Sequence, residues 1–158
     1  MRSGVIVTTI ALLLTLAAPA GAWVLILVDG QWTPTLTQTS LAGGAGSDFV
    51  PSLESAPDVV TVDVYSSTAW RLTVERQDVS WPDGVGLSVR STSADRFAGT
   101  LTANETYTSV SASPVEIASG TRRGFWYTYA DLGFQYRLEN LSASFFFNDT
   151  ATTEVYTV

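Results

Sequence analysis

Apolar and polar residues alternate with a period of two along most of this chain, and turn-forming residues separate the alternating stretches. Residues 60–65 and 70–75 are the clearest examples, with Val, Leu or Trp at every second position and Thr, Asp, Tyr, Arg or Glu between them. Such alternation predicts strands that bury one face. The short polar segment 66–68 between the two stretches favours an antiparallel hairpin.

The same pattern predicts about nine short strands and no helix after the first 22 residues. Asp29-Gly30 and the proline-containing stretch 81–84 are among the turn signals that separate them, and Leu87 and Val89 are expected to face the core. An all-β chain with turn signals at this spacing is typical of an antiparallel β-sandwich, either Ig-like or pilin-like. The expected strands are 23–28, 60–65, 70–75, 85–90, 97–102, 106–110, 115–117, 125–129 and 134–138.

The first 22 residues have the layout of a secretory signal peptide. Arg2 supplies the positive charge, residues 5–16 form the apolar segment, and residues 20–22 offer a small-residue cleavage site before Trp23. The sequence therefore predicts a protein that is secreted or displayed at the cell surface. An uncleaved anchor over residues 5–28 is the alternative, since about 20 apolar residues span a bilayer, but Pro19 and Gly21 interrupt that run.

Residues 23–144 have the length of a single domain. Residues 41–57 are rich in glycine and contain two prolines, which predicts a long loop or a hinge. The chain has no cysteine, so an exported domain of this kind relies on its core instead of disulfides.

Charge excludes several functions. The chain carries 15 acidic and 8 basic residues, a net charge of -7, which argues against nucleic-acid binding and against adhesion to anionic membranes once the signal is cleaved. All basic residues are arginine. The absence of lysine and histidine removes the usual Schiff-base nucleophile, proton shuttle and imidazole metal ligand. We expect no enzyme activity, no cofactor and no metal site.

The carboxylates offer a different interpretation. Asp63, Glu75 and Asp78 are candidates for the acid and base of a sugar hydrolase. Solvated charges on a strand face, paired with Arg71 or Arg76, are the favoured explanation, because no insertion supplies a cleft. The Asp-Gly dipeptides lack the repeated spacing of a calcium loop and are better explained as turns.

Aromatic residues give the main binding hypothesis. In residues 125–129, strand alternation places Tyr129 on one face and Trp126 on the other, so one of the two faces is expected to expose rings unless both are buried. Trp81, beside a predicted turn, would extend such a platform. Flat rings stack on sugars, so Trp81, Trp126 and Tyr129 are the candidate ligand-binding residues. Packing in the core is the competing and favoured explanation for these side chains.

The very apolar stretch 23–28 is prone to aggregation if it is left unpaired. It is therefore either an internal strand, which is the default expectation, or a donor strand that completes the sheet of another molecule. In the second case residues 41–57 would be the connection that lets it reach a neighbour.

A family resemblance covers residues 58–144. It rests on the order of Asp63-Val-Tyr, the stretch from Trp70 to Arg76, Trp81, Leu87-Ser-Val-Arg90 and Phe134-Gln-Tyr-Arg-Leu138. This order resembles small exported bacterial β-sandwich surface proteins of unassigned function, and more distantly pilin-like and spore-coat-like subunits. The resemblance implies a β-sandwich and a role at the cell surface. In such families a further strand follows the Tyr-Arg-Leu strand.

In this chain residues 145–158 occupy that place. From Asn148 to Thr157 they resemble the translation of a common sequencing-adapter oligonucleotide, with Val155 as the departure, and residues 145–147 would translate a run of T. We therefore expect residues 145–158 to be an artefactual tail of a metagenomic fragment, and the native last strand to be missing. A genuine terminal strand is the alternative.

Together these observations predict an exported structural or adhesive component of a surface or extracellular assembly, without catalytic activity. Its expected partners are further copies of itself or other surface proteins. The alternative is a carbohydrate-binding module that holds a polysaccharide with exposed aromatic rings.

Overall fold

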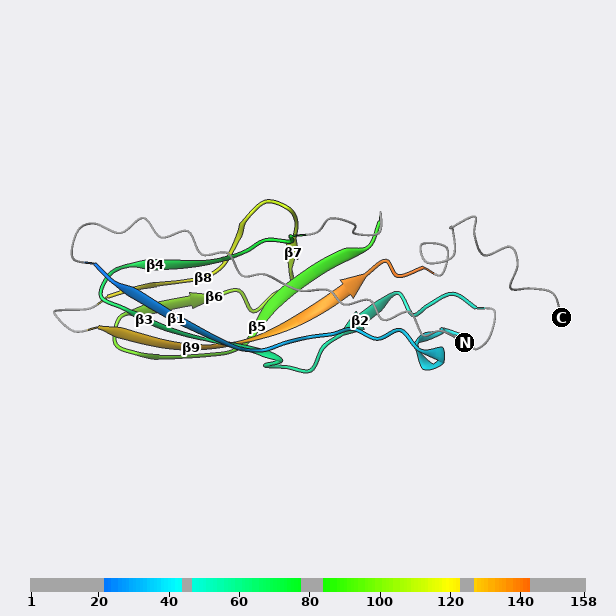
Figure 1. The fold of residues 1–158 in the computed structure, drawn as a ribbon, viewed down its shortest axis with the longest axis horizontal. Coiled ribbons are helices and arrows are strands. Elements are labelled where there is room, and N and C mark those ends of the chain that lie inside the picture. Colours follow the sequence, from blue (N-terminus) through cyan, green and yellow to red (C-terminus); the bar gives the residue numbers. More distant parts are fainter. Residues whose placement is uncertain (1–21, 44–46, 78–83, 123–126, 143–158) are drawn as a thin grey trace.

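The computed structural model describes residues 22–43, 47–77, 84–122 and 127–142. Within these ranges the chain is all-β, with two antiparallel sheets that form a β-sandwich, as the alternation predicted (Figure 1). Its elements are β1 (Val24–Gly30), the 3-10 helix η1 (Gln38–Ser40), β2 (Ser52–Glu54), β3 (Val60–Ser66), β4 (Trp70–Val74), β5 (Gly86–Phe97), β6 (Thr100–Ala103), β7 (Thr108–Val110), β8 (Val115–Thr121) and β9 (Thr128–Glu139).

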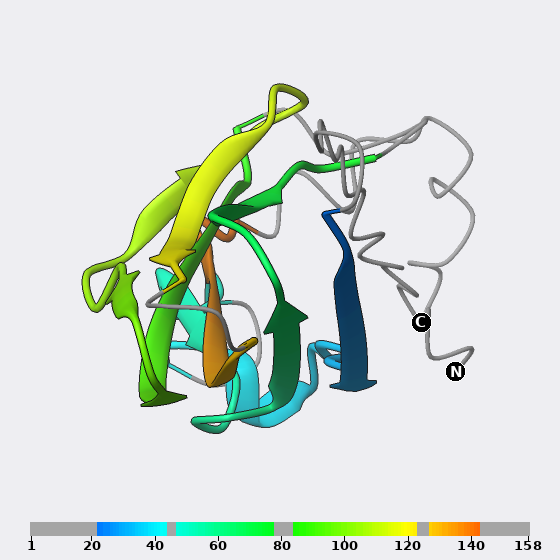
Figure 2. The same ribbon diagram turned by 90° about the vertical axis from the view of Figure 1, so that its left-hand side faces the viewer.

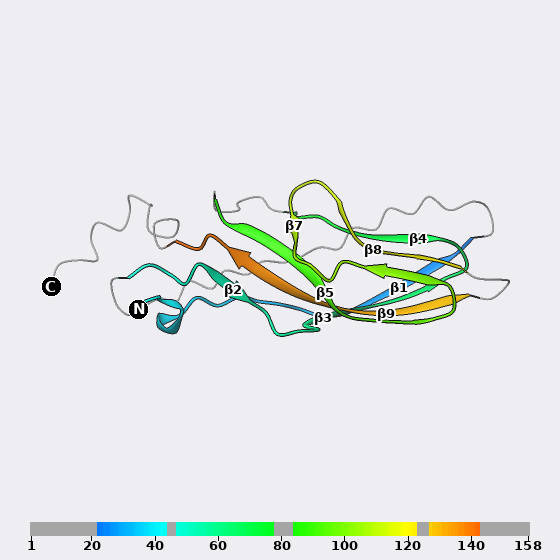
Figure 3. The same cartoon turned by 180° about the vertical axis from the view of Figure 1, so that it is seen from behind.

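The larger sheet has six strands. Five follow the order β1-β3-β9-β5-β7, and the sixth, β2, pairs with the last part of β9, beyond the part that pairs with β3. The smaller sheet has three strands in the order β4-β8-β6. Figure 2 shows β1 at one side of the sandwich, next to β3. The two longest strands, β5 and β9, run side by side through the middle of the six-stranded sheet (Figure 3). All pairings within the described residues are antiparallel.

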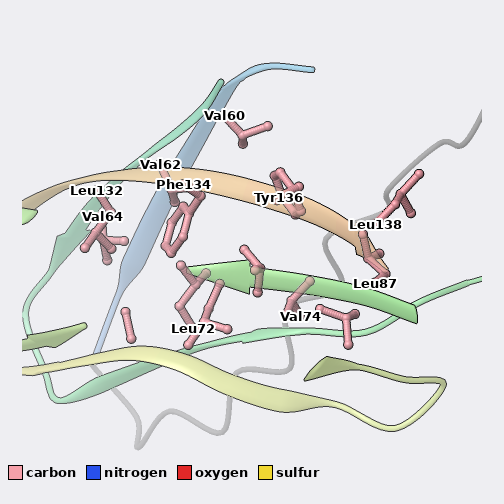
Figure 4. Close-up of a cluster of buried hydrophobic side chains, with 14 of the residues drawn as sticks. Val60, Val62, Val64, Leu72, Val74, Leu87, Leu132, Phe134, Tyr136 and Leu138 are labelled. Atoms are coloured by element: carbon pink, nitrogen blue, oxygen red, sulfur yellow. The ribbon is translucent and has the colours of Figure 1, made fainter. Parts of the chain in front are cut away.

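The core lies between the two sheets. The even-numbered residues of β3 and β9 point inward, where Val64, Leu132 and Phe134 are almost completely buried. Leu72 and Val74 of β4 meet them from the three-stranded sheet, and Figure 4 shows these side chains between the ribbons. The predicted core positions Leu87 and Val89 are confirmed as buried. Burial of apolar surface is the main force that holds the two sheets together.

The predicted hairpin of residues 60–65 and 70–75 is wrong. β3 pairs with β1 and β9, whereas β4 pairs with β8 in the other sheet. Ser66 turns the chain between the sheets: its hydroxyl donates to the Thr68 carbonyl at 2.8 Å and accepts from the Thr68 amide at 3.1 Å. Two successive half-apolar strands bury their apolar faces equally well by facing one another across a core as by lying side by side, so alternation alone does not decide between them.

The segment 41–57 is more structured than a loop or hinge. Leu41 and Phe49 form an isolated β-bridge, β2 pairs with the last part of β9, and Ser55 is buried. The Ser55 amide donates to the Tyr136 carbonyl at 2.9 Å, and its hydroxyl accepts from the Tyr136 amide at 3.0 Å. Because this serine supplies strand-like hydrogen bonds, the segment is fixed to the sheet after residue 50.

β9 joins most of the two strands that the sequence predicted separately at 125–129 and 134–138. Its pairing with β5 shifts register between Ser91 and Ser93. Opposite this shift lies Gly133, where a side chain would overlap the carboxylate of Asp58. That carboxylate accepts hydrogen bonds from Thr92 Oγ1 at 2.6 Å and Ser93 Oγ at 2.8 Å. Glycine at 133 therefore leaves room for a carboxylate that fixes the irregular part of β5.

Candidate functional site

Of the three predicted ligand-binding residues, Trp81 and Trp126 lie outside the described residues. Tyr129 lies on β9, half-buried, on the face of the six-stranded sheet that points away from the three-stranded sheet. We call this face the outer face. The exposed Tyr127 lies two residues earlier, so this side of the aromatic stretch is not core, contrary to the favoured packing explanation.

Strand register places Tyr129 in a row of four apolar side chains that crosses the outer face. Leu25 of β1 pairs with Tyr65 of β3, Tyr65 with Tyr129, and Tyr129 with Phe97 at the end of β5. The rings of Tyr65 and Tyr129 lie 4.8 Å apart between centroids. At a strand spacing of about 4.8 Å, this apolar row is about 14 Å long.

The exposed apolar surface of the described residues is concentrated around this row. Phe97 is 65% exposed, and the other large apolar side chains with substantial exposure are close to half exposed. Trp23 and Tyr127 lie beside the row, with ring centroids 6.4 Å apart. The six side chains come from β1 and the residue before it, from the end of β5 and from the residue before β9: Trp23, Leu25, Leu27, Val28, Phe97 and Tyr127. Val28 points to the other side of the sheet, like its buried partner Val62 on β3.

A second row lies one step along the strands, about 7 Å away. It begins with Leu27 and continues with three carboxylates on neighbouring strands, Asp63, Asp131 and Asp95. Like charges directly opposite one another on a sheet are destabilising. We call the apolar row, this aspartate row and the adjoining Trp23 and Tyr127 the open end of the outer face.

One hydrogen bond links the two rows. The phenol of Tyr129 donates to Asp63 Oδ1 at 2.9 Å. This bond to the neutral phenol is the main reason why the pKa of Tyr129 rises to about 12, with desolvation and the nearby charge of Asp131 adding to the effect. The bond keeps the Tyr129 ring in place beside Tyr65, so the apolar row is positioned by the carboxylate next to it.

The other end of the outer face is covered by side chains from the same chain, and we call it the covered end. The guanidinium of Arg137 lies 3.9 Å from the ring centroid of Tyr107 and forms ion pairs with Glu139 and, at 3.8 Å, with Glu54. Arg90 also contacts the Tyr107 ring. Its guanidinium donates two hydrogen bonds, of 3.0 and 2.8 Å, to Gln135 Oε1.

The structure does not bring Asp63 and Glu75, two of the candidate catalytic carboxylates, together. Asp63 lies on the outer face of the six-stranded sheet, whereas Glu75 follows β4 of the other sheet and accepts a hydrogen bond from Gln77 Nε2 at 3.1 Å. Asp78 lies outside the described residues. Arg71 pairs with Glu116 at 3.5 Å, not with the expected partners. Within the described ranges no three acidic side chains are grouped closely enough to hold a metal ion.

Sequence reasoning found Tyr129 but missed the residues that surround it. Leu25, Tyr65 and Phe97 come from three other strands, and only the strand order brings them beside it. Alternation was a usable signal for the side on which Leu25 and Tyr65 lie, because both lie opposite the more buried positions of their strands. It fails for Phe97, because the register shift within β5 moves this residue from the side of the buried positions to the outer face. The local pattern gave no signal for the register.

No helix in the described part of the chain has the length and apolar character needed to cross a membrane. No protein-family model, curated protein or solved structure matches the chain. The function is therefore argued from the open end itself.

Proposed function

We propose that this protein is an exported structural or adhesive component of a surface or extracellular assembly, and that the open end is its contact surface. The domain acts by binding and carries out no catalysis. Export rests on the signal-peptide pattern of residues 1–22, and the absence of histidine, lysine and cysteine favours a non-catalytic role.

The observation that carries the proposal is the gathering, at one end of one face, of five of the six exposed large apolar side chains of the described residues. Scattered exposed leucines are normal on a soluble protein, but a contiguous group marks an interaction site. The outer face is covered by Tyr107, Arg90 and Arg137 at its other end. Since the described residues cover one end with their own side chains and leave the other uncovered, the open end is available to another molecule.

The test is to place a charge in the contact surface. Leu27→Lys and Phe97→Lys should shift the secreted protein from assembled or cell-bound fractions to free monomer in a secreting bacterial host. Thr102→Lys, at an exposed position of the edge strand β6, is the matched control and should behave as the unchanged protein. Circular dichroism checks that each variant is folded. If the open-end variants fractionate as the unchanged chain does, the open end is not the contact surface.

A second candidate function, polysaccharide binding, is favoured by the composition of the two rows. The partly buried rings of Tyr65 and Tyr129 lie beside carboxylates that could accept hydrogen bonds from sugar hydroxyls. This combination of stacking surface and polar groups suits a sugar chain. It retains Tyr129 from the sequence-based platform and replaces the two tryptophans, which are not described, by Tyr65 and Phe97.

This candidate predicts that soluble polysaccharides change the tryptophan fluorescence, because Trp23 contacts Tyr127 at the open end. Phe97→Ala should weaken the change, whereas Thr102→Ala should leave it intact. The protein should remain monomeric while it binds. A flat titration across neutral, amino-substituted and acidic polysaccharides would remove this candidate and leave the assembly role in place.

A further inference from the structure

β1 is the last strand of the six-stranded sheet on its side, with β3 as its one strand neighbour among the described residues. From Val24 to Val28 it carries no charge and no proline, and its pairing with β3 is free of bulges. Charges, prolines and bulges normally protect a natural edge strand from pairing with another chain. β1 lacks them over five residues, which makes it suitable for the addition of another strand.

The hydrogen bonds at its start show which backbone groups are available. The Ser67 amide donates to the Trp23 carbonyl at 3.1 Å, and the Trp23 amide donates to Ser67 Oγ at 3.0 Å, so the groups of Trp23 face β3. Along an antiparallel strand the direction alternates at every residue. Leu25 and Leu27 therefore also use their backbone groups on β3, while those of Val24, Ile26 and Val28 point to the free edge.

We propose that the occupant of this edge is β1 of a second copy of the chain, antiparallel, with Ile26 opposite Ile26. This inference rests on the proposed assembly function and names its partner. In this register Val24 lies opposite Val28 of the second copy and Val28 opposite its Val24. Each of the three pairs makes two hydrogen bonds, so every outward group of these residues is used.

Side chains also fit this register. On the outer face Leu25 lies opposite Leu27 of the second copy, and the reverse pair completes a cluster of four leucines, each about half exposed in the single chain. On the other side Val28, itself 49% exposed, is covered by Val24. Contacts of this self-complementary kind are expected for a two-fold interface, where residue i meets residue j and j meets i.

The charges favour the same arrangement. The aspartate row ends at Leu27, so across the interface it continues with Leu25 and then Tyr65 of the second copy. The aspartate row of each copy therefore lies in line with the apolar row of the other copy, and the two aspartate rows do not face one another. Asp29 lies opposite Trp23 at the rim. A shift of the register by two residues, which places Leu27 opposite Leu27, would place Asp29 opposite Leu25 instead. Gly30 then ends the strand with φ of +87°, at a position where a side chain would clash with the Val59 carbonyl.

Because the full chain has no cysteine, single-cysteine variants report the register directly. Leu25 and Leu27 of the two copies would form non-hydrogen-bonded pairs, whose Cα separation of about 4.5 Å suits a disulfide. A mixture of Leu25→Cys and Leu27→Cys proteins should therefore cross-link under mild oxidation, and neither variant alone should do so. Mixing Leu25→Cys with Thr102→Cys, at an exposed position of the edge strand β6 in the three-stranded sheet, is the control for random collision.

Sedimentation velocity on the unchanged chain should show a concentration-dependent dimer. Leu27→Lys should raise the dissociation constant of this dimer at least about tenfold, because it places two charges in the leucine cluster. Cross-linking of Leu27→Cys or of Leu25→Cys with itself would overturn the proposed register. A monomer at all concentrations, with no specific cross-link, would overturn the second copy as partner. The assembly function would survive that result if Leu27→Lys still released the protein from cell-bound fractions, and would fail with it if it did not.

Discussion

The two ends of the outer face share the strands β5 and β9 but differ in what covers them. At the covered end, Arg137 is held between the ring of Tyr107 and two glutamates, and β2 adds a strand beside β9. At the open end, Phe97 is 65% exposed and three aspartates lie on neighbouring strands. The covered end pairs its charges within the chain, whereas the open end leaves its apolar side chains half exposed and sets like charges side by side.

This difference separates stability from interaction. Ion pairs, cation-π contacts and added strands within one chain stabilise the folded state of that chain. Exposed apolar groups and adjacent like charges contribute little to the stability of a single chain, and the charges oppose it. Substitutions at the covered end should therefore change unfolding, and substitutions at the open end should change association.

The largest effect is expected at the boundary between the two ends. Gly133→Ala would push a methyl group into the Asp58 carboxylate and break its bonds to Thr92 and Ser93. We expect a loss of about 2–4 kcal/mol in the free energy of unfolding, from overpacking and lost hydrogen bonds together. Urea denaturation measures it. Asp58→Ala in the same background should restore part of the loss; if it restores none, the clash is not with Asp58.

A smaller loss is expected from the covered end. Arg137→Ala removes the contact with Tyr107 and both ion pairs, and should cost about 1–3 kcal/mol of unfolding free energy. Arg71→Ala is the matched control: its side chain is 78% exposed and pairs with Glu116, so its loss should stay within about 0.5 kcal/mol. Equal losses for the two arginines in urea denaturation would mean that the covered end is not fixed by Arg137.

The sequence was sufficient for the fold class, most of the strands and the core, but not for β2, for the full length of β9 or for the two rows. Alternation identified Val60, Val62 and Val64 as core, because burial on one side of a strand is a local property. The neighbours of Tyr129 depend on strand order, which is set by how two sheets cover one another. The hairpin expected for β3 and β4 failed for the same reason, and the contact of Tyr107 with Arg137 joins residues from distant parts of the chain.

Alkaline pH provides a finer comparison, between Tyr129 at the open end and Tyr136 beneath the sheet. Both pKa values are raised from 10.0 to about 12, by the hydrogen bond to Asp63 in the first case and by burial in the second. The folded state therefore binds protons more tightly, and this stability, complete below pH 10, should be lost as pH rises from about 10 to 12. Tyr129→Phe and Asp63→Asn should each make the loss smaller in thermal unfolding scans. An unchanged pH profile in both would show that the bond does not hold the phenol.

The smallest effect should come from the middle of the aspartate row, and its sign is the informative part. Asp131 lies opposite both Asp63 and Asp95, so Asp131→Asn keeps the shape of the side chain and removes repulsion on two sides. We expect a gain of about 0.2–0.5 kcal/mol in the free energy of unfolding at low salt, which should shrink as salt screens the row. Ser109→Asn, at an exposed position of β7, controls for the effect of a strand asparagine. A loss of stability on Asp131→Asn would mean that the carboxylate supports the fold as Arg137 does, and the open end would then differ from the covered end in exposure alone.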